Sequence, residues 1–120
     1  MSNSSFSLLG NPNCGKTAVF NLLTGLNQKV SNYPGITVEK KVSSIRLNDT
    51  TTISLEDYPG SYSLIPQSLD EQIVSDALVS WIKNPSQRPD GLIYVADITN
   101  LRRNLYFFSQ IYQNLSYLIS

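Results

Sequence analysis

The residues best suited to chemistry lie near the amino terminus, in the segment Gly10-Asn11-Pro12-Asn13-Cys14-Gly15-Lys16-Thr17. The segment fits the pattern G-x-x-x-x-G-K-[ST], which binds the phosphates of nucleoside triphosphates. Its glycines let the backbone curl so that N–H groups point toward phosphate oxygens. We expect Lys16 to reach the β- and γ-phosphates and the Thr17 hydroxyl to bind Mg²⁺. An apolar run at 6–9 and a helix-like run at 17–23 supply the strand–loop–helix setting that this chemistry requires.

Two segments further along the chain extend this phosphate chemistry. Asp57-Tyr58-Pro59-Gly60 fits D-x-x-G, which predicts that the Asp57 carboxylate holds Mg²⁺ through water. The Gly60 N–H is predicted to contact the γ-phosphate, so that loss of this phosphate releases the loop. Thr37, in a loop between helix and strand, is predicted to complete the Mg²⁺ shell when a triphosphate is bound. Either segment alone also fits an ordinary turn, so both predictions depend on the phosphate loop.

Composition excludes several other chemistries. The 120 residues suffice for one domain with a modest core, and nine basic residues balance nine acidic ones, so we expect no nucleic-acid partner. One cysteine and no histidine exclude an internal disulfide, the common zinc sites, and Ser-His or Cys-His catalysis. Cys14 is predicted to contribute its backbone N–H, with a reactive thiol as the alternative.

The order of elements predicts an α/β fold with a mainly parallel sheet. Strands are expected at 6–9, 38–47, 50–55 and 91–96, and helices at 17–23, 69–82 and 101–118. Residues 27–35 and 84–90 are expected to be loops. Asn48-Asp49 predicts one antiparallel hairpin. The last helix is predicted to carry its apolar face on Leu105, Phe108, Ile111, Tyr112 and Leu115. The phosphate loop would lie at the carboxyl ends of the strands, where such sheets bind ligands.

Five segments together resemble the N-terminal G domain of ferrous iron transport protein B, a family of bacterial Fe²⁺ transporters. They are residues 10–17, 31–39, 57–64, 68–72 and 95–106, and the likeness runs from about Phe6 to the end of the chain. The Tyr-Ser-Leu after D-x-P-G and the Asn-Leu-x-Arg-Asn-Leu-Tyr run at 100–106 distinguish this family from other small GTPases. The resemblance implies a P-loop NTPase fold of the Ras-like G-domain type, with helices on both faces of the sheet.

The resemblance also implies a set of site residues. The nucleotide would be bound by Gly10, Asn11, Pro12, Asn13, Cys14, Gly15, Lys16, Thr17, Ala18, Gly35, Ile36, Thr37, Asp57 and Gly60. Mg²⁺ would be held by Thr17, Thr37 and Asp57. Asn13 would help to bind K⁺, which supports hydrolysis by neutralising charge near the β,γ-bridge. Lys16, Thr37, Gly60 and Asn13 are thus the expected catalytic residues.

For the whole polypeptide, the resemblance implies a GTP- and GDP-binding switch domain at the cytoplasmic face of the bacterial inner membrane. A helical regulatory domain and a transmembrane region would follow in the same polypeptide, and residues 1–120 would be a partial, C-terminally truncated GTPase domain. Ser61 stands where many GTPases place a catalytic Gln, so slow hydrolysis is expected.

Two departures from the family pattern leave other readings open. The guanine-reading N-x-x-D motif does not occur in the chain; alignment places it just beyond Ser120, with the chain ending inside a further strand. Glu56 replaces a usual apolar residue and should find a partner or solvent. A non-catalytic phosphate-binding or interaction module is the alternative function, and a GTPase unrelated to transport is a third, which residues 97–106 argue against. An exposed sheet edge near Val95 is expected to favour self-association.

Overall fold

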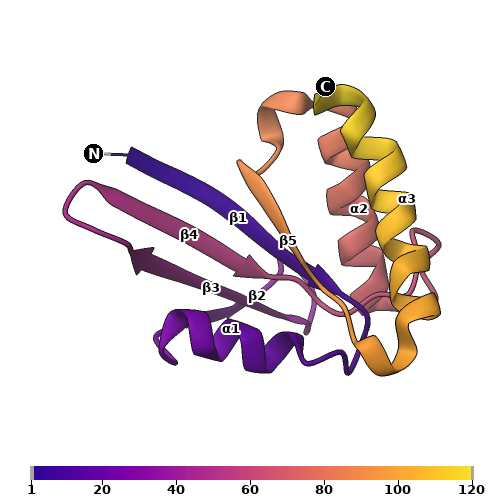
Figure 1. Ribbon diagram of the computed structural model, residues 1–120, viewed down its shortest axis with the longest axis horizontal. Helices are drawn as coiled ribbons and strands as arrows, with labels where there is room; N and C mark the ends of the chain where they lie inside the picture. The colour runs from indigo at the N-terminus through magenta and orange to yellow at the C-terminus, as the bar shows by residue number, and fades with distance from the viewer. Residues whose placement is uncertain (1, 120) are drawn as a thin grey trace.

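Five strands form one mixed sheet in the computed structural model, which describes residues 2–119 (Figure 1). The strands are β1 (Ser2–Gly10), β2 (Lys29–Asn32), β3 (Glu39–Arg46), β4 (Thr51–Asp57) and β5 (Gly91–Val95). Their order across the sheet is β2-β3-β4-β1-β5. β1 runs parallel to both β4 and β5, whereas β3 runs antiparallel to β2 and β4. The carboxyl ends of β1, β4 and β5 therefore meet at one edge of the sheet, as predicted.

Helices cover both faces of this sheet. α1 (Lys16–Thr24) lies on one side, and α2 (Leu69–Lys83) and α3 (Leu101–Ile119) lie side by side on the other (Figure 1). Short 3₁₀ turns, η1 (Pro85–Gln87) and η2 (Ile98–Asn100), flank β5. None of the described helices combines the length and the apolar character needed to cross a membrane.

Two adjacent leucines of β1 divide the core into two clusters, because successive strand residues point to opposite faces. Leu8 packs with Phe20 of α1 and Leu55 of β4. Leu9 packs on the other face with residues of α2 and α3, including Leu78 and Phe107. β1 is thereby fixed from both sides, and the loop that leaves its carboxyl end starts from a rigid position.

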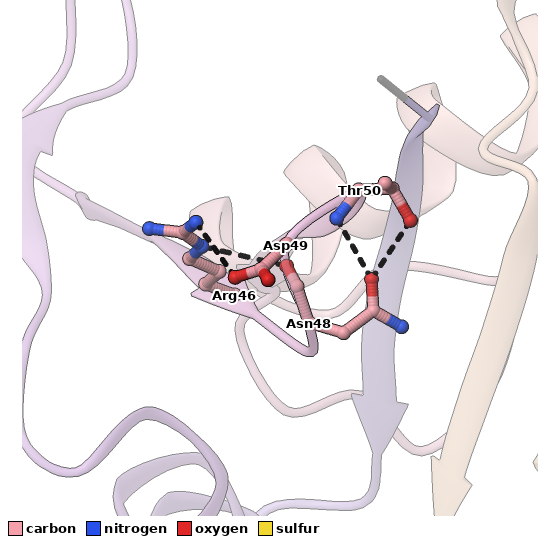
Figure 2. A network of polar contacts seen from close by, with 4 residues as sticks. All are labelled: Arg46, Asn48, Asp49 and Thr50. Atoms are coloured by element: carbon pink, nitrogen blue, oxygen red, sulfur yellow. Dashed lines mark hydrogen bonds and ion pairs between the residues drawn. The ribbon is translucent and has the colours of Figure 1, made fainter.

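The β3–β4 hairpin turns where the sequence predicts it. The Asn48 side-chain oxygen accepts hydrogen bonds from the Thr50 N–H at 2.9 Å and from the Thr50 hydroxyl at 3.0 Å, while Arg46 lies 3.3 Å from the Asp49 carboxylate (Figure 2). Both members of the Arg46–Asp49 pair are largely exposed, so the side-chain turn at Asn48 contributes more to the register than the ion pair does.

Three expectations about the elements are wrong. Residues 29–32 form β2 inside the predicted loop; all four side chains are exposed, so the strand comes from backbone pairing with β3 and leaves no apolar pattern to detect. The face expected for α3 is wrong in part: Ile111 and Leu115 are buried as expected, together with Asn104 and Phe107, whereas Leu105, Phe108 and Tyr112 are exposed. The described residues do not enter the further strand that was expected, because α3 continues to Ile119. β5 does form an edge of the described sheet, as expected near Val95.

Candidate functional site

The phosphate loop joins β1 to α1 through two left-handed residues. Asn13 has φ of 60° and Gly15 has φ of 91°, a region that Asn and Gly adopt more readily than other residues. Gly15 immediately precedes α1, and no side chain caps the helix there. Because the first N–H groups of a helix lack intrahelical partners, this uncapped end is suited to an anion such as a phosphate.

Gly10 serves close packing at the start of the loop. A Cβ atom on Gly10 would lie 2.7 Å from the Val95 carbonyl oxygen and 2.9 Å from the Cys14 Sγ. Only glycine therefore lets the loop approach the end of β5. The structure gives Gly10 and Cys14 a packing role here, at the base of the loop.

Lys16 forms an ion pair with Asp57, the last residue of β4. The lysine of the phosphate loop and the carboxylate of D-x-x-G, which lie far apart in the sequence, are thus in direct contact. Their side chains are only 10% and 6% exposed, so the pair is largely shielded from solvent.

Two clefts, of about 400 and 420 Å³, share Lys16 and Thr17. Thr37 and Asp57 also line the first cleft, so the three predicted Mg²⁺ ligands surround one space. Hydroxyl and carboxylate oxygens are the donors that this ion prefers, and the residues present therefore fit it. The second cleft is also lined by Asn11, Pro12, Asn13, Gly15 and Gly60. Ala18, Gly35 and Ile36 line neither cleft.

The loop between β4 and α2, residues 58–68, is tied to the phosphate loop. The Ser61 N–H donates to the Gly10 carbonyl at 2.9 Å, and the Asn11 side-chain amide donates to the Ser61 carbonyl at 2.7 Å. A Cβ atom on Gly60 would lie 2.7 Å from both the N and the Cα of Pro12. The β4–α2 loop therefore contacts the phosphate loop backbone to backbone, and Gly60 reaches the second cleft.

The Glu71 carboxylate, in the first turn of α2, accepts several hydrogen bonds from the β4–α2 loop. It accepts hydrogen bonds from the Tyr62 N–H at 3.0 Å, the Gln67 N–H at 2.9 Å and the Ser61 hydroxyl at 3.3 Å. Burial acts to raise the pKa of Glu71, but these hydrogen bonds outweigh it and hold the pKa below its ordinary value. Ser61 is fully buried and lines neither cleft. The Ser61 hydroxyl also donates to the Ser63 carbonyl at 3.0 Å, within the same loop.

α3 supports the β4–α2 loop from a third side. The Arg103 guanidinium lies 3.9 Å from the centre of the Tyr62 ring, and the Gln110 side-chain oxygen accepts from the Leu64 N–H at 2.9 Å. Asn104 fixes the start of α3 by accepting from the Asp97 N–H at 3.1 Å. These contacts explain part of the Asn-Leu-x-Arg-Asn-Leu-Tyr run, to which sequence reasoning assigned no role.

The loop between β2 and β3, residues 33–38, carries Thr37 and is anchored differently. Its anchor is the Tyr33 hydroxyl, which donates to the Glu56 carboxylate at 2.9 Å. Glu56 has thus found a partner, as its unusual place in a strand required. Sequence reasoning missed Tyr33 and Glu71 as structural contacts, although the spacing Ser68-x-x-Glu71 is a recognisable helix-start signal.

The family model of ferrous iron transport protein B matches residues 4–119. The chain belongs to this family. The Fe(2+) transporter FeoB of Legionella pneumophila (strain Lens) is 43% identical over 110 residues, covering 88% of this chain and 14% of the relative. That of Leptospira biflexa is 44% identical over 104 residues, covering 87% and 14%. The chain thus spans a small part of the length of the FeoB relatives it matches.

Solved FeoB structures confirm the predicted P-loop NTPase fold. The crystal structure of the G domain of T. maritima FeoB is 42% identical with a TM-score of 0.81, covering 94% of this chain and 67% of that one. A mutant of S. thermophilus NFeoB bound to mGDP is 42% identical with a TM-score of 0.79, covering 94% and 40%. The chain therefore corresponds to the N-terminal G domain of FeoB.

Proposed function

We propose that this chain binds guanine nucleotides and hydrolyses GTP slowly, as the switch domain of a ferrous iron transporter. The observation that carries the proposal is the convergence of Lys16, Thr17, Thr37 and Asp57 on one cleft beside the uncapped end of α1. A FeoB relative of this fold has been solved with mGDP bound, which supports a guanine nucleotide as the ligand.

In this proposal, the phosphate loop binds the nucleotide and Lys16 exchanges partners. Lys16 leaves the Asp57 carboxylate for the β- and γ-phosphates, and the N–H groups at the start of α1 donate to the same phosphates. Asp57, Thr17 and Thr37 would hold Mg²⁺, which neutralises charge on the phosphate oxygens when it is bound. The exchange restores a partner to both members of the buried pair, so that neither charge is left uncompensated.

The Gly60 N–H would distinguish a bound triphosphate from a bound diphosphate. This N–H lies in the loop that contacts the phosphate loop, and donation to the γ-phosphate would add one bond that a diphosphate cannot offer. Since Ser61 is buried, no side chain at that position orients the attacking water. Hydrolysis would then depend on charge neutralisation at the phosphates, which accounts for the slow rate that we propose.

Asn13 is the proposed K⁺ ligand. Measuring the rate of GTP hydrolysis in K⁺ and in Na⁺ tests both this role of Asn13 and the GTPase proposal. The Asn13 side chain lines the second cleft beside Lys16 and Gly60. In a polypeptide that also contains the base-recognition motif, we expect faster hydrolysis in K⁺ than in Na⁺. Asn13→Ala should abolish the difference while sparing most nucleotide binding, and Asn114→Ala on α3 is the matched control. Hydrolysis that is absent in both salts would reject the GTPase proposal, and a K⁺ preference that survives in Asn13→Ala would reject Asn13.

The second candidate function is a phosphate-binding module without catalysis. Discrimination between bases requires hydrogen bonds to the base edge, and the 120 residues contain no N-x-x-D motif. We therefore expect the chain itself to bind GTP and ATP analogues with similar affinity, and a longer polypeptide with the motif to prefer GTP. A preference for guanine above about tenfold in the 120-residue chain would show that other residues read the base.

The proposal for the whole transporter follows the family. The relatives continue well beyond the matched region, and one structure is described as the cytosolic domain of L. pneumophila FeoB. We propose that this G domain likewise lies on the cytoplasmic face of the inner membrane, followed by a helical regulatory domain and a transmembrane region. Nucleotide state would reach the transmembrane region through those intervening helices.

A further inference from the structure

We propose that Tyr33 and Glu56 form a latch that positions Thr37 beside Asp57 and thereby favours triphosphate over diphosphate binding. Tyr33 and Glu56 are positioning residues, because the latch acts through Thr37 and touches no substrate. This inference rests on the nucleotide-binding function proposed above and extends it to two residues with no assigned role.

Three hydrogen bonds of Tyr33 define the latch. Its N–H donates to the Val38 carbonyl at 3.0 Å, and its carbonyl accepts from the Ile36 N–H at 3.2 Å. These two bonds close residues 33–38 into a compact turn, with Thr37 next to the closing residue. The third bond, from the Tyr33 hydroxyl to Glu56 at 2.9 Å, joins that turn to β4.

The latch connects parts of the sheet that do not pair with each other. Tyr33 directly follows β2, the edge strand, whereas Glu56 lies on β4, and β3 runs between them. Glu56 pairs with Val42 of β3 and directly precedes Asp57. The residue that anchors the turn is therefore next in sequence to the carboxylate that lines the cleft.

Among the described residues, no other side-chain hydrogen bond joins this turn to the rest of the sheet. Every side chain of β2 is exposed, and Pro34, Gly35 and Thr37 are exposed as well. Tyr33 is half-buried, and the Lys40 ammonium lies 5.8 Å from the centre of its ring. The half-buried side chains of Ile36 and Val38 add apolar contacts. The phenol–carboxylate bond is the directional side-chain constraint on the position of the turn.

The chemistry of the pair suits a durable bond. Burial, and then the charge of Glu56, raise the pKa of the Tyr33 hydroxyl well above its ordinary value. The hydroxyl therefore stays protonated and donates to the carboxylate. A hydrogen bond to an ionised acceptor is about twice as strong as one between neutral groups, so one such bond is enough to anchor a short turn.

The latch matters most for the triphosphate state. Thr37 is proposed to bind Mg²⁺ only when the γ-phosphate is present. A change in the position of Thr37 should therefore weaken the binding of GTP more than the binding of GDP. Loss of the latch should lower the affinity ratio of GTP to GDP. A defect that merely loosened the fold would weaken both nucleotides together.

The experiment measures the affinities of GDP and of a non-hydrolysable GTP analogue for the 120-residue chain, by calorimetry in saturating Mg²⁺. Tyr33→Phe removes only the hydroxyl, and Glu56→Leu removes the acceptor. We expect each to weaken the GTP analogue about five- to tenfold and to leave GDP within about twofold. The double variant should be no worse than either single one, because both remove the same bond.

Two further variants separate positioning from general damage. Glu56→Gln keeps an acceptor oxygen and should restore most of the affinity ratio. Tyr112→Phe removes an exposed hydroxyl on α3 and should change neither affinity. Equal weakening of both nucleotides in Tyr33→Phe, or no weakening, would overturn the latch.

A measurement without nucleotide distinguishes failure of the latch from failure of the proposed function. Hydrogen exchange of the Tyr33 and Ile36 amides should accelerate in Tyr33→Phe relative to the unmodified chain, because their bonds close the turn. Unchanged exchange would overturn the latch even if no nucleotide bound. Accelerated exchange with no binding by any variant would instead reject the nucleotide-binding function.

Discussion

The two loops that face the nucleotide clefts are held in very different ways. The β4–α2 loop is fixed from three sides: by Asn11 of the phosphate loop, by the Glu71 carboxylate of α2, and by Arg103 and Gln110 of α3. The β2–β3 loop has one side-chain hydrogen bond among the described residues, from Tyr33 to Glu56, beside a longer contact of 5.8 Å between the Lys40 ammonium and the Tyr33 ring. The β4–α2 loop is thus held by contacts with several elements, whereas the β2–β3 loop is joined to β4 by a single hydrogen bond.

This difference suggests a division of roles between the loops. A segment with few buried contacts opens at a lower free-energy cost than one with many, and such segments are the ones that move in switching. We therefore expect the β2–β3 loop, with Thr37, to respond first to the loss of the γ-phosphate. The β4–α2 loop, with Gly60, would transmit its state to α2 and α3.

Glu71→Ala should have the largest effect on stability, because it removes an anchor of the firmly held β4–α2 loop. The substitution leaves the Tyr62 and Gln67 N–H groups without their acceptor, so we expect the free energy of unfolding to fall by about 3 kcal/mol. Urea denaturation of the two proteins at neutral pH measures the difference. A loss below about 0.5 kcal/mol would mean that Glu71 does not hold the β4–α2 loop.

The pH dependence of the same variant sharpens the test. Because the folded protein lowers the pKa of Glu71, the carboxylate stabilises the fold at pH values above its ordinary pKa of 4.5. That contribution is lost as the pH falls through the lower pKa of the folded state. The gap in stability between the unmodified chain and Glu71→Ala should therefore narrow in acid.

Two glycine substitutions, one in each loop, should have smaller effects on stability. The size and cause of the loss should differ between the two loops. Gly60→Ala places a Cβ against the Pro12 backbone, which should cost about 2 kcal/mol of stability. Gly35 has φ of 76° and open space around its Cβ position, so Gly35→Ala should cost about 1 kcal/mol through backbone strain alone. Thermal melts of both variants give the comparison.

Asparagine at the same two positions is the control. Asn tolerates positive φ, so Gly35→Asn should recover most of the lost stability. Gly60→Asn should be at least as unstable as Gly60→Ala, because the obstacle is the Pro12 backbone. Recovery at position 60 would show that the β4–α2 loop is not packed against the phosphate loop.

The sequence predicted those features of the fold that depend on local signals. The phosphate loop, the turn at Asn48 and the strand at 91–95 each carry residues whose backbone preferences or apolar runs act over a few positions. β2 could not be predicted, because its four exposed side chains owe their conformation to hydrogen bonds with β3. The face of α3 was misjudged because two overlapping apolar stripes fit a helical period, and only the sheet decides which is buried.

The sequence predicted the residues that line the candidate site, but not the residues that hold the surrounding loops in place. Lys16, Thr17, Thr37 and Asp57 were placed by motif, and the structure brings them to one cleft. Tyr33 and Glu56 act through a contact between strands that do not pair with each other, and Glu71 acts through hydrogen bonds to the loop just before its helix. No local pattern encodes such contacts, apart from the helix-start spacing at Ser68 and Glu71.

The most direct test of the account is the affinity of Lys16→Ala for Mg²⁺–GDP, measured by calorimetry beside the unmodified chain. Lys16 supplies the charge-assisted bond to the phosphates, so we predict a loss of about 2–4 kcal/mol, a weakening of about 30-fold or more. Lys83→Ala, at the exposed end of α2, is the matched control and should bind as the unmodified chain does. Equal affinity in Lys16→Ala and the unmodified chain would contradict the phosphate-loop account.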